Sequence, residues 1–234
     1  MKFGSLISTL GAVAVLAACA SPASRFYTLG SSDARPVSSA PASFYFELAP
    51  VDMPQQVAKN QLVVQTSPAQ VRVLEEERWA SLPGDEVRRA LSADLTQQLG
   101  AIDVYGTPHP DAVPVYRVKV NVQRFESWPG SQAVIDAVWS VRAAGSDTVL
   151  TCRTVAQERV GSGYDALVEG HRKAVDELAS AISAGVRSLG SLPRTTASAP
   201  VAPAKGKSGA VTKPASAPML PCPVASAATT ASAP

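Results

Sequence analysis

The chain has 234 residues, of which 46% are hydrophobic, and this length suits one domain with an appended tail or two small domains. Charged residues make up 17% and the formal net charge is +2. This composition excludes a nucleic-acid binder with a strongly basic face and an acidic, solvating protein.

An apolar run opens the chain. Lys2 precedes a stretch from Leu6 to Leu16 that is too short to cross a bilayer core of about 30 Å as a stable helix. The pattern predicts a signal peptide over residues 1–18. No later stretch approaches the roughly 18 apolar residues of a membrane span, so we expect a protein anchored to a membrane rather than spanning it.

The signal ends in Leu16-Ala17-Ala18-Cys19, the order that bacterial lipoprotein processing requires. The small residues fit the peptidase, and the thiol of Cys19 accepts a diacylglycerol before cleavage. Three acyl chains on Cys19, each buried methylene contributing about 0.8 kcal/mol, would make the attachment effectively permanent. The alternative is an ordinary cleaved signal peptide with an incidental cysteine. Ala20 stands where an Asp would signal retention in the inner membrane, which favours the outer membrane with the domain facing the periplasm.

Residues 19–43 are predicted to form the lipidated N-terminus and a connector. The segment Ser24–Leu29 is short and apolar-aromatic and suits a strand. Residues 31–41 are rich in Ser, Pro and Ala, which is typical of an extended connector.

A domain is predicted over residues 44–192, and it begins with strands. Phe44, Phe46 and Leu48 alternate with more polar residues, as in a strand with one buried face. The segments 62–66 and 70–79 follow as two strands separated by Ser67-Pro68, and we expect them to pair as a hairpin.

The first helix is predicted after the turn residues 82–86, with Asp85 as its N-cap and Gly100 as its stop. Its apolar positions recur at four-residue spacing: Val87, Leu91, Leu95 and Leu99. Alternation then predicts strands over 116–123, 133–141 and 148–160, joined by turns at 128–131 and 145–147, as an antiparallel meander.

A longer helix is predicted from Tyr164 to Leu189. Its apolar stripe is wide enough to cover a sheet face: Tyr164, Leu167, Val168, His171, Val175, Leu178, Ile182, Val186 and Leu189. Runs of strands with only two helices predict an α+β fold, a mainly antiparallel sheet with both amphipathic helices packed on one face.

Residues 193–234 are rich in Ala, Pro, Ser and Thr and contain no acidic residue. We expect a disordered tail, because such a segment has almost nothing to bury. Four basic residues give the tail an alternative role as a contact to anionic lipid or cell wall: Arg194, Lys205, Lys207 and Lys213.

The search for catalytic residues yields no candidate. His109 lies in a Pro-flanked loop, and His171 falls on the buried stripe, where a hydrogen-bonded structural role is expected. Ser162 lies between two glycines without the spacing of a nucleophile elbow. Gly206-Lys207-Ser208 lacks the glycine and the strand that precede a phosphate loop. No metal-ligand spacing is present either, so we expect no cofactor and no metal.

Two cysteines remain besides Cys19. Cys152 and Cys222 are a candidate disulfide in a compartment that permits disulfides, and an inert buried thiol at Cys152 is the alternative. Among the tryptophans, Trp139 alternates with core positions. Trp128, in a turn, and Trp79 are the candidate partner contacts, Trp128 being the better one.

Several short segments in a fixed order carry a family resemblance. They are Phe26-Tyr27-Thr28-Leu29 after the lipobox, Val51-Asp52-Met53-Pro54 leading to Gln61-Leu62-Val63, Arg78-Trp79-Ala80, and Tyr116-Arg117-Val118 through Phe125 to Ala137-Val138-Trp139. With them, residues 25–190 resemble the ABC-type transport auxiliary lipoproteins, the group that includes PqiC and the lipoprotein partners of Mce-domain transporters. Ser81-Leu82-Pro83 departs from the family, which tends to have an acidic residue and Pro-Leu there.

The resemblance implies a non-catalytic component of a system that moves lipid between the inner and outer membranes. Its implied partners are an Mce-domain protein, a permease and an ATPase, and a homo-oligomer is conceivable by analogy. One alternative is a structural outer-membrane lipoprotein that binds cell wall or another envelope complex through its basic tail. A lipoprotein hydrolase is a third hypothesis, and Ser162 would be its nucleophile.

Overall fold

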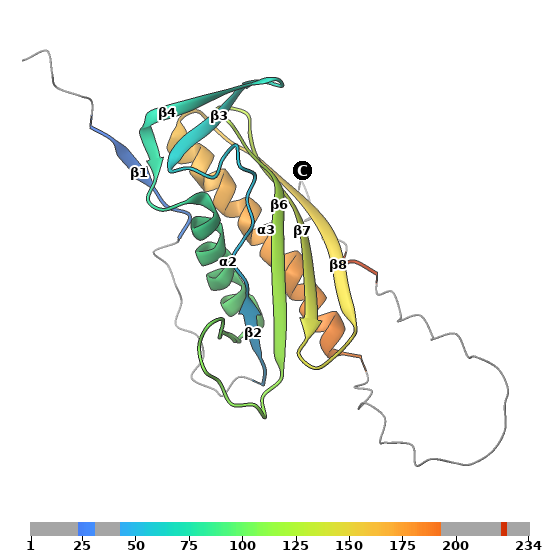
Figure 1. The fold of residues 1–234 in the computed structure, drawn as a ribbon. Coiled ribbons are helices and arrows are strands. Elements are labelled where there is room, and N and C mark those ends of the chain that lie inside the picture. Colours follow the sequence, from blue (N-terminus) through green and yellow to red (C-terminus); the bar gives the residue numbers. More distant parts are fainter. Residues whose placement is uncertain (1–22, 31–42, 193–220, 224–234) are drawn as a thin grey trace, which may run out of the picture.

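The computed structural model describes residues 23–30, 43–192 and 221–223 (Figure 1). Two sheets and two long helices make up this part of the chain, so the predicted α+β class is confirmed. The sequence did not reveal the division into two sheets, since alternation shows which residues form strands but not which strands pair.

The larger sheet has the strand order β5-β2-β6-β7-β8. Its strands are β2 (Tyr45–Leu48), β5 (Ile102–Asp103), β6 (Val115–Trp128), β7 (Gln132–Ala143) and β8 (Val149–Arg159). The antiparallel pairing of β6 with β7 and of β7 with β8 confirms the predicted meander. By contrast, β2 runs parallel to both of its neighbours, β5 and β6.

The smaller sheet has the order β1-β4-β3. Its strands are β1 (Arg25–Tyr27), β3 (Gln61–Ser67) and β4 (Gln70–Trp79). The antiparallel pairing of β3 with β4 confirms the predicted hairpin. β1 pairs in parallel with the end of β4, Phe26 opposite Arg78, so the segment nearest Cys19 is built into the domain.

Helix α2 (Pro83–Leu99) starts three residues earlier than predicted. Leu82 is its N-cap, and the prediction of Asp85 as the N-cap is wrong because Pro83, whose ring fixes φ near the helical value, already belongs to the first turn. The predicted stop at Gly100 is confirmed. Gly100 has φ 62°, and its N–H donates to the Thr96 carbonyl, which closes the helix.

Helix α3 (Tyr164–Gly190) lies against β7 and β8 and beside α2 (Figure 1). Both helices share one core with the apolar side of the large sheet, where Phe46, Val118 and Trp139 are fully or almost fully buried. Glycine permits the close approach of α3 to the sheet, because a Cβ at Gly185 would lie 2.8 Å from the Trp139 ring. Both helices therefore cover the same face, as predicted.

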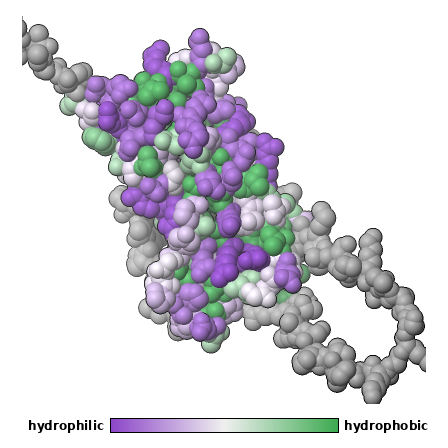
Figure 2. All heavy atoms as spheres, viewed as in Figure 1, coloured by the Kyte–Doolittle hydropathy of each residue, from purple (hydrophilic) through white to green (hydrophobic). Residues whose placement is uncertain are grey.

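Neither of the two described helices lies on the other face of the large sheet. Figure 1 views the molecule with β6, β7 and β8 in front of α3, and Figure 2, from the same side, shows hydrophilic residues over much of this surface. We call it the outer face. Within residues 23–30, 43–192 and 221–223, no helix is long and apolar enough to span a membrane.

Candidate functional site

The predicted anchor lies outside the described residues, and so does the predicted tail except for residues 221–223. This applies to Cys19 with its signal peptide and to the basic residues Arg194, Lys205, Lys207 and Lys213. The structure does describe residues 23–30, the segment next to the anchor. We call it the anchor-proximal segment, and three elements of the domain bind it.

Glu77 on β4 holds the first part of the segment. Its side chain is almost fully buried, and it accepts hydrogen bonds from the Tyr27 hydroxyl at 2.6 Å and from Arg25 Nε at 3.0 Å. Burial alone disfavours the charged carboxylate, but these hydrogen bonds outweigh it and hold the pKa of Glu77 below its usual range. Burial and the bond to Glu77 together raise the pKa of Tyr27 to about 12.

Glu86 in the first turn of α2 holds the second part. Its carboxylate is completely buried, and one oxygen accepts from Thr28 Oγ1 at 2.8 Å and from the Leu29 N–H at 3.0 Å. The other oxygen accepts from the backbone N–H and hydroxyl of Ser81 and pairs with Arg89. Despite its burial, this set of donors holds the pKa of Glu86 below its usual range.

Helix α3 adds a third attachment. Arg172 donates from Nη2 to the Thr28 carbonyl at 2.7 Å and pairs with Glu169 on its own helix. Leu29, between these polar contacts, is 2% exposed and belongs to the core. β4, α2 and α3 therefore all bind the anchor-proximal segment, through Glu77, Glu86 and Arg172. We call these three residues and the segment that they hold the clasp.

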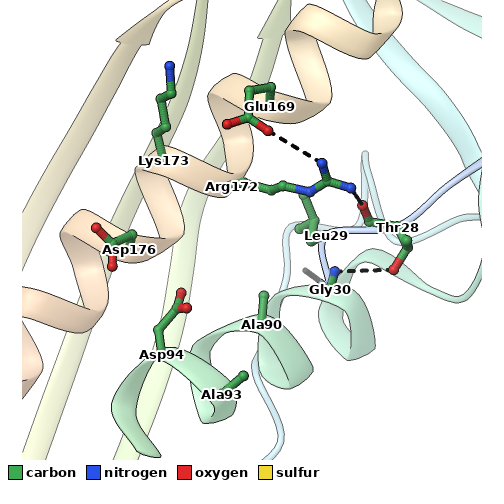
Figure 3. A pocket seen from close by; sticks show the side chains of 10 residues that line it. All are labelled: Thr28, Leu29, Gly30, Ala90, Ala93, Asp94, Glu169, Arg172, Lys173 and Asp176. Atoms are coloured by element: carbon green, nitrogen blue, oxygen red, sulfur yellow. Dashed lines mark hydrogen bonds and ion pairs between the residues drawn. The ribbon is translucent and has the colours of Figure 1, made fainter. Parts of the chain in front are cut away.

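A groove of about 520 Å³ opens beside the clasp, between α2 and α3 (Figure 3). Its walls combine apolar residues with both signs of charge: Thr28, Leu29, Gly30, Ala90, Ala93, Asp94, Glu169, Arg172, Lys173 and Asp176. Asp94 of α2 and Asp176 of α3 lie on facing helices in Figure 3. Burial and the Asp176 charge raise the pKa of Asp94 to about 6.

The two described histidines are engaged away from the groove. His171 is completely buried, stacks on Phe125 with ring centroids 4.1 Å apart, and its Nε2 lies 2.8 Å from the Ser127 hydroxyl. Burial lowers the pKa of His171 to about 3, so the ring is neutral at physiological pH. His109 in its loop lies 3.7 Å from the Glu47 carboxylate.

Neither histidine is therefore placed to activate Ser162, which lies in an exposed turn before α3. No group of three or more His, Cys, Asp or Glu side chains suited to a metal ion occurs in the part of the chain that the structure describes.

The two predicted partner-contact residues, Trp79 and Trp128, differ in their exposure to solvent. Trp79 is 3% exposed and packs edge-on against Phe125, so a partner cannot reach it and it is excluded as a contact residue. Trp128 is half-buried at the end of β6, and its Nε1 donates to Glu126 at 3.1 Å on the outer face.

Cys152 and Cys222 come together. The structure joins their Sγ atoms in a disulfide that fastens residues 221–223 to β8, and Cys152 itself is buried. The sequence showed the two residues but no geometry to pair them.

The clasp residues Glu77 and Glu86 were not singled out from the sequence. A signal was present for Glu77, which is two residues from Trp79 and so shares a strand face with a large apolar side chain. For Glu86, an acidic residue in a first helical turn is ordinarily explained by the helix dipole, which hides a buried role.

Three comparisons place the chain among known proteins. A family model described as "ABC-type transport auxiliary lipoprotein component" matches residues 27–183. No curated protein matches the chain. A crystal structure of an uncharacterized protein is 21% identical with a TM-score of 0.57 and covers 70% of this chain and 99% of its own, which shows a shared fold. A crystal structure of a Xanthomonas campestris protein is 13% identical with a TM-score of 0.49 and covers 63% of this chain and 86% of its own.

Proposed function

Since the chain belongs to the family of ABC-type transport auxiliary lipoprotein components, we propose that it is a non-catalytic, lipid-anchored component of a transporter that moves lipids between the inner and outer membranes. The anchor would be the acylated Cys19, held in the outer membrane with the domain in the periplasm. The implied partners are an Mce-domain protein with its permease and ATPase.

The clasp is the observation that supports this role best. An anchor positions a domain only if the chain between them is short and fixed at the domain end. Five residues lie between Cys19 and Arg25, and the six residue-to-residue steps of a fully extended chain reach about 20 Å. From Arg25 onward the segment is bound to the two buried carboxylates Glu77 and Glu86, so the domain would stay close to the membrane surface.

No contact among the described residues supports the hydrolase hypothesis. The hydrolase hypothesis requires Ser162 beside a base, and both described histidines bond elsewhere. The cell-wall alternative depends on the basic tail, which lies outside the described residues, and no observation in the described domain favours it.

Anchoring is tested by labelling cells with palmitate and fractionating the envelope. We expect label on the wild-type protein in outer-membrane fractions and no label on Cys19→Ser. Uptake of label by Cys19→Ser would contradict lipidation at this residue. Recovery of the wild type only in the inner membrane would contradict the outer-membrane location.

Partner binding is tested through Trp128, whose ring is half-buried at the end of the outer face. We expect Trp128→Ala to reduce co-purification of the Mce-domain protein severalfold while leaving the unfolding temperature nearly unchanged, because bulky aromatic side chains often dominate protein contacts. Tyr105→Ala is the matched control, since Tyr105 is an aromatic residue 46% exposed in a loop elsewhere. Equal co-purification of Trp128→Ala and wild type would rule out this contact.

A further inference from the structure

The outer face carries a group of basic residues at the end where β6 begins. Arg117 and Lys119 of β6 and Arg142 of β7 are all exposed on this face, and we call them the basic patch. The patch is a property of the sheet register and does not depend on the groove or the clasp.

The register places two of these charges directly against each other. Arg117 is the cross-strand partner of Arg142, and Lys119, one step along the same face, is the partner of Ser140. Side chains directly opposite in an antiparallel pair have Cβ atoms about 5 Å apart, and diagonal neighbours about 7–8 Å. Like charges at such positions destabilise a sheet, so fold stability gives no reason for this arrangement.

Only one described carboxylate compensates the patch. Glu47 of β2 pairs with Arg117 at 2.8 Å and also approaches His109. Lys119 and Arg142 form no ion pair with any residue that the structure describes. Further along the same face two arginines are neutralised, since Arg124 pairs with Glu126 and Arg153 pairs with Asp136. Arg159, at the far end of β8, is exposed but stands alone among the described residues, opposite Gln132.

The surroundings of the patch indicate what it binds. Beside it lie the hydroxyl residues Ser140 and Thr151 and the 48% exposed side chain of Val149, which is the cross-strand partner of Arg142. Clustered arginine and lysine side chains with neighbouring hydroxyls suit phosphate oxygens.

We propose that the basic patch docks on a bilayer surface that carries anionic phospholipid headgroups. This inference goes beyond the proposed transport role and rests on the sheet face alone. Basic residues near an anionic membrane each contribute about 1 kcal/mol of attraction, which corresponds to about fivefold in affinity.

The patch would be a contact separate from the lipid anchor. Along α3, Arg172 meets the anchor-proximal segment, whereas Gly190 lies next to the Tyr116 hydroxyl, at the end of the sheet that carries the patch but on its opposite, buried face. At 1.5 Å per residue, these two points of the helix are about 27 Å apart. Docking of the patch would therefore fix the orientation of the domain, which a single anchor leaves free to rotate.

The test uses the lipidated protein held in phosphatidylcholine nanodiscs, so that its acyl chains are already occupied. The nanodiscs are mixed with vesicles of phosphatidylcholine alone or with about 30% phosphatidylglycerol, and co-flotation is measured. We expect flotation with the anionic vesicles only, weakened on the order of 100-fold by Arg117→Gln, Lys119→Gln and Arg142→Gln together, and about fivefold by Arg142→Gln alone.

Arg159→Gln is the matched control, because Arg159 is exposed at the opposite end of the large sheet and the substitution removes the same charge. We expect it to float like the wild type. An equal loss with Arg159→Gln would show attraction by overall charge and overturn the proposal. Absence of flotation by the wild type would overturn the proposal too. If, in addition, the patch variants lost an acidic protein partner from envelopes, the patch would be a protein contact and not a membrane contact. Circular dichroism checks that each variant is folded.

Discussion

Replacing Glu86 by glutamine tests the clasp. The two carboxylate oxygens accept bonds from Thr28, Leu29 and Ser81 within a completely buried site. A glutamine retains only one of these two oxygens. Its NH₂ group takes the place of the other oxygen and therefore faces N–H and O–H donors with no acceptor. Two donors then lose their acceptor in a place that water does not reach.

The magnitude follows from these bonds. A hydrogen bond to a charged group contributes about 1.5–3 kcal/mol, and two neighbouring losses are not fully additive. The ion pair with Arg89 adds little, because the Arg89 side chain is 56% exposed. We expect Glu86→Gln to lower the free energy of unfolding by about 3–4 kcal/mol and the melting temperature by about 10 °C.

The assay is urea unfolding followed by circular dichroism, together with limited trypsin cleavage after Arg25. Cleavage of Glu86→Gln should be faster, since the anchor-proximal segment is released. Glu75→Gln is the control, because Glu75 is 65% exposed and should change stability by less than about 0.5 kcal/mol. A Glu86→Gln protein as stable and as resistant as the control would refute the clasp.

The pH dependence gives a second check on the same residue. The folded pKa of Glu86 lies below its unfolded value of about 4.3, so its contribution is complete above that pH and is lost as the pH falls through the folded pKa. The difference in stability between the wild type and Glu86→Gln should therefore shrink in acid. A difference that stays constant down to about pH 3 would mean that the ionised carboxylate is not the acceptor.

Three further predictions concern the core and the groove. The folded pKa of His171, about 3, lies below its unfolded value of 6.5, so the contribution of His171 to stability should be complete above about pH 6.5. Below that pH the free energy of unfolding should fall by about 1.4 kcal/mol per pH unit. Urea unfolding at a series of pH values should show a flatter slope for His171→Gln and the wild-type slope for His109→Gln. The pKa of Asp94, about 6, lies above its unfolded value of 3.9, so the fold favours the protonated carboxyl and stability falls as the pH rises through this window. Compared with the wild type, Asp94→Asn should be about 1 kcal/mol more stable at pH 7.5 and equally stable at pH 4. Gly185→Ala should cost about 2 kcal/mol in thermal unfolding because its Cβ meets the Trp139 ring, whereas Gly161→Ala, with only an ordinary contact at 3.8 Å, should be neutral.

The strands and helices with strong periodicity could be predicted from the sequence. The alternation around Val118 and the four-residue spacing from Val87 onward report burial directly, because a strand or helix with one buried face must repeat at its own period. The parallel neighbours of β2 could not be predicted. Tyr45 pairs with Val115 and with Ile102, and such distant pairings leave no local pattern in the sequence.

The candidate site was predictable to a smaller extent. The motif around Tyr27 and Thr28 marked the right segment, but its partners Glu77 and Glu86 lie far along the chain. A carboxylate looks the same in a sequence whether it is solvated or buried, and only the fold decides which donors surround it. Trp79 shows the converse, since a large aromatic residue at a strand end is as consistent with a core position as with a contact.

Affinity purification of the lipidated wild-type protein from envelopes after mild crosslinking, with mass spectrometry of the recovered proteins, tests the transport role most directly. The proposed function predicts recovery of an Mce-domain protein together with a permease and an ATPase, and loss of all three with Cys19→Ser. Recovery of cell-wall fragments or unrelated outer-membrane proteins without these partners would contradict it.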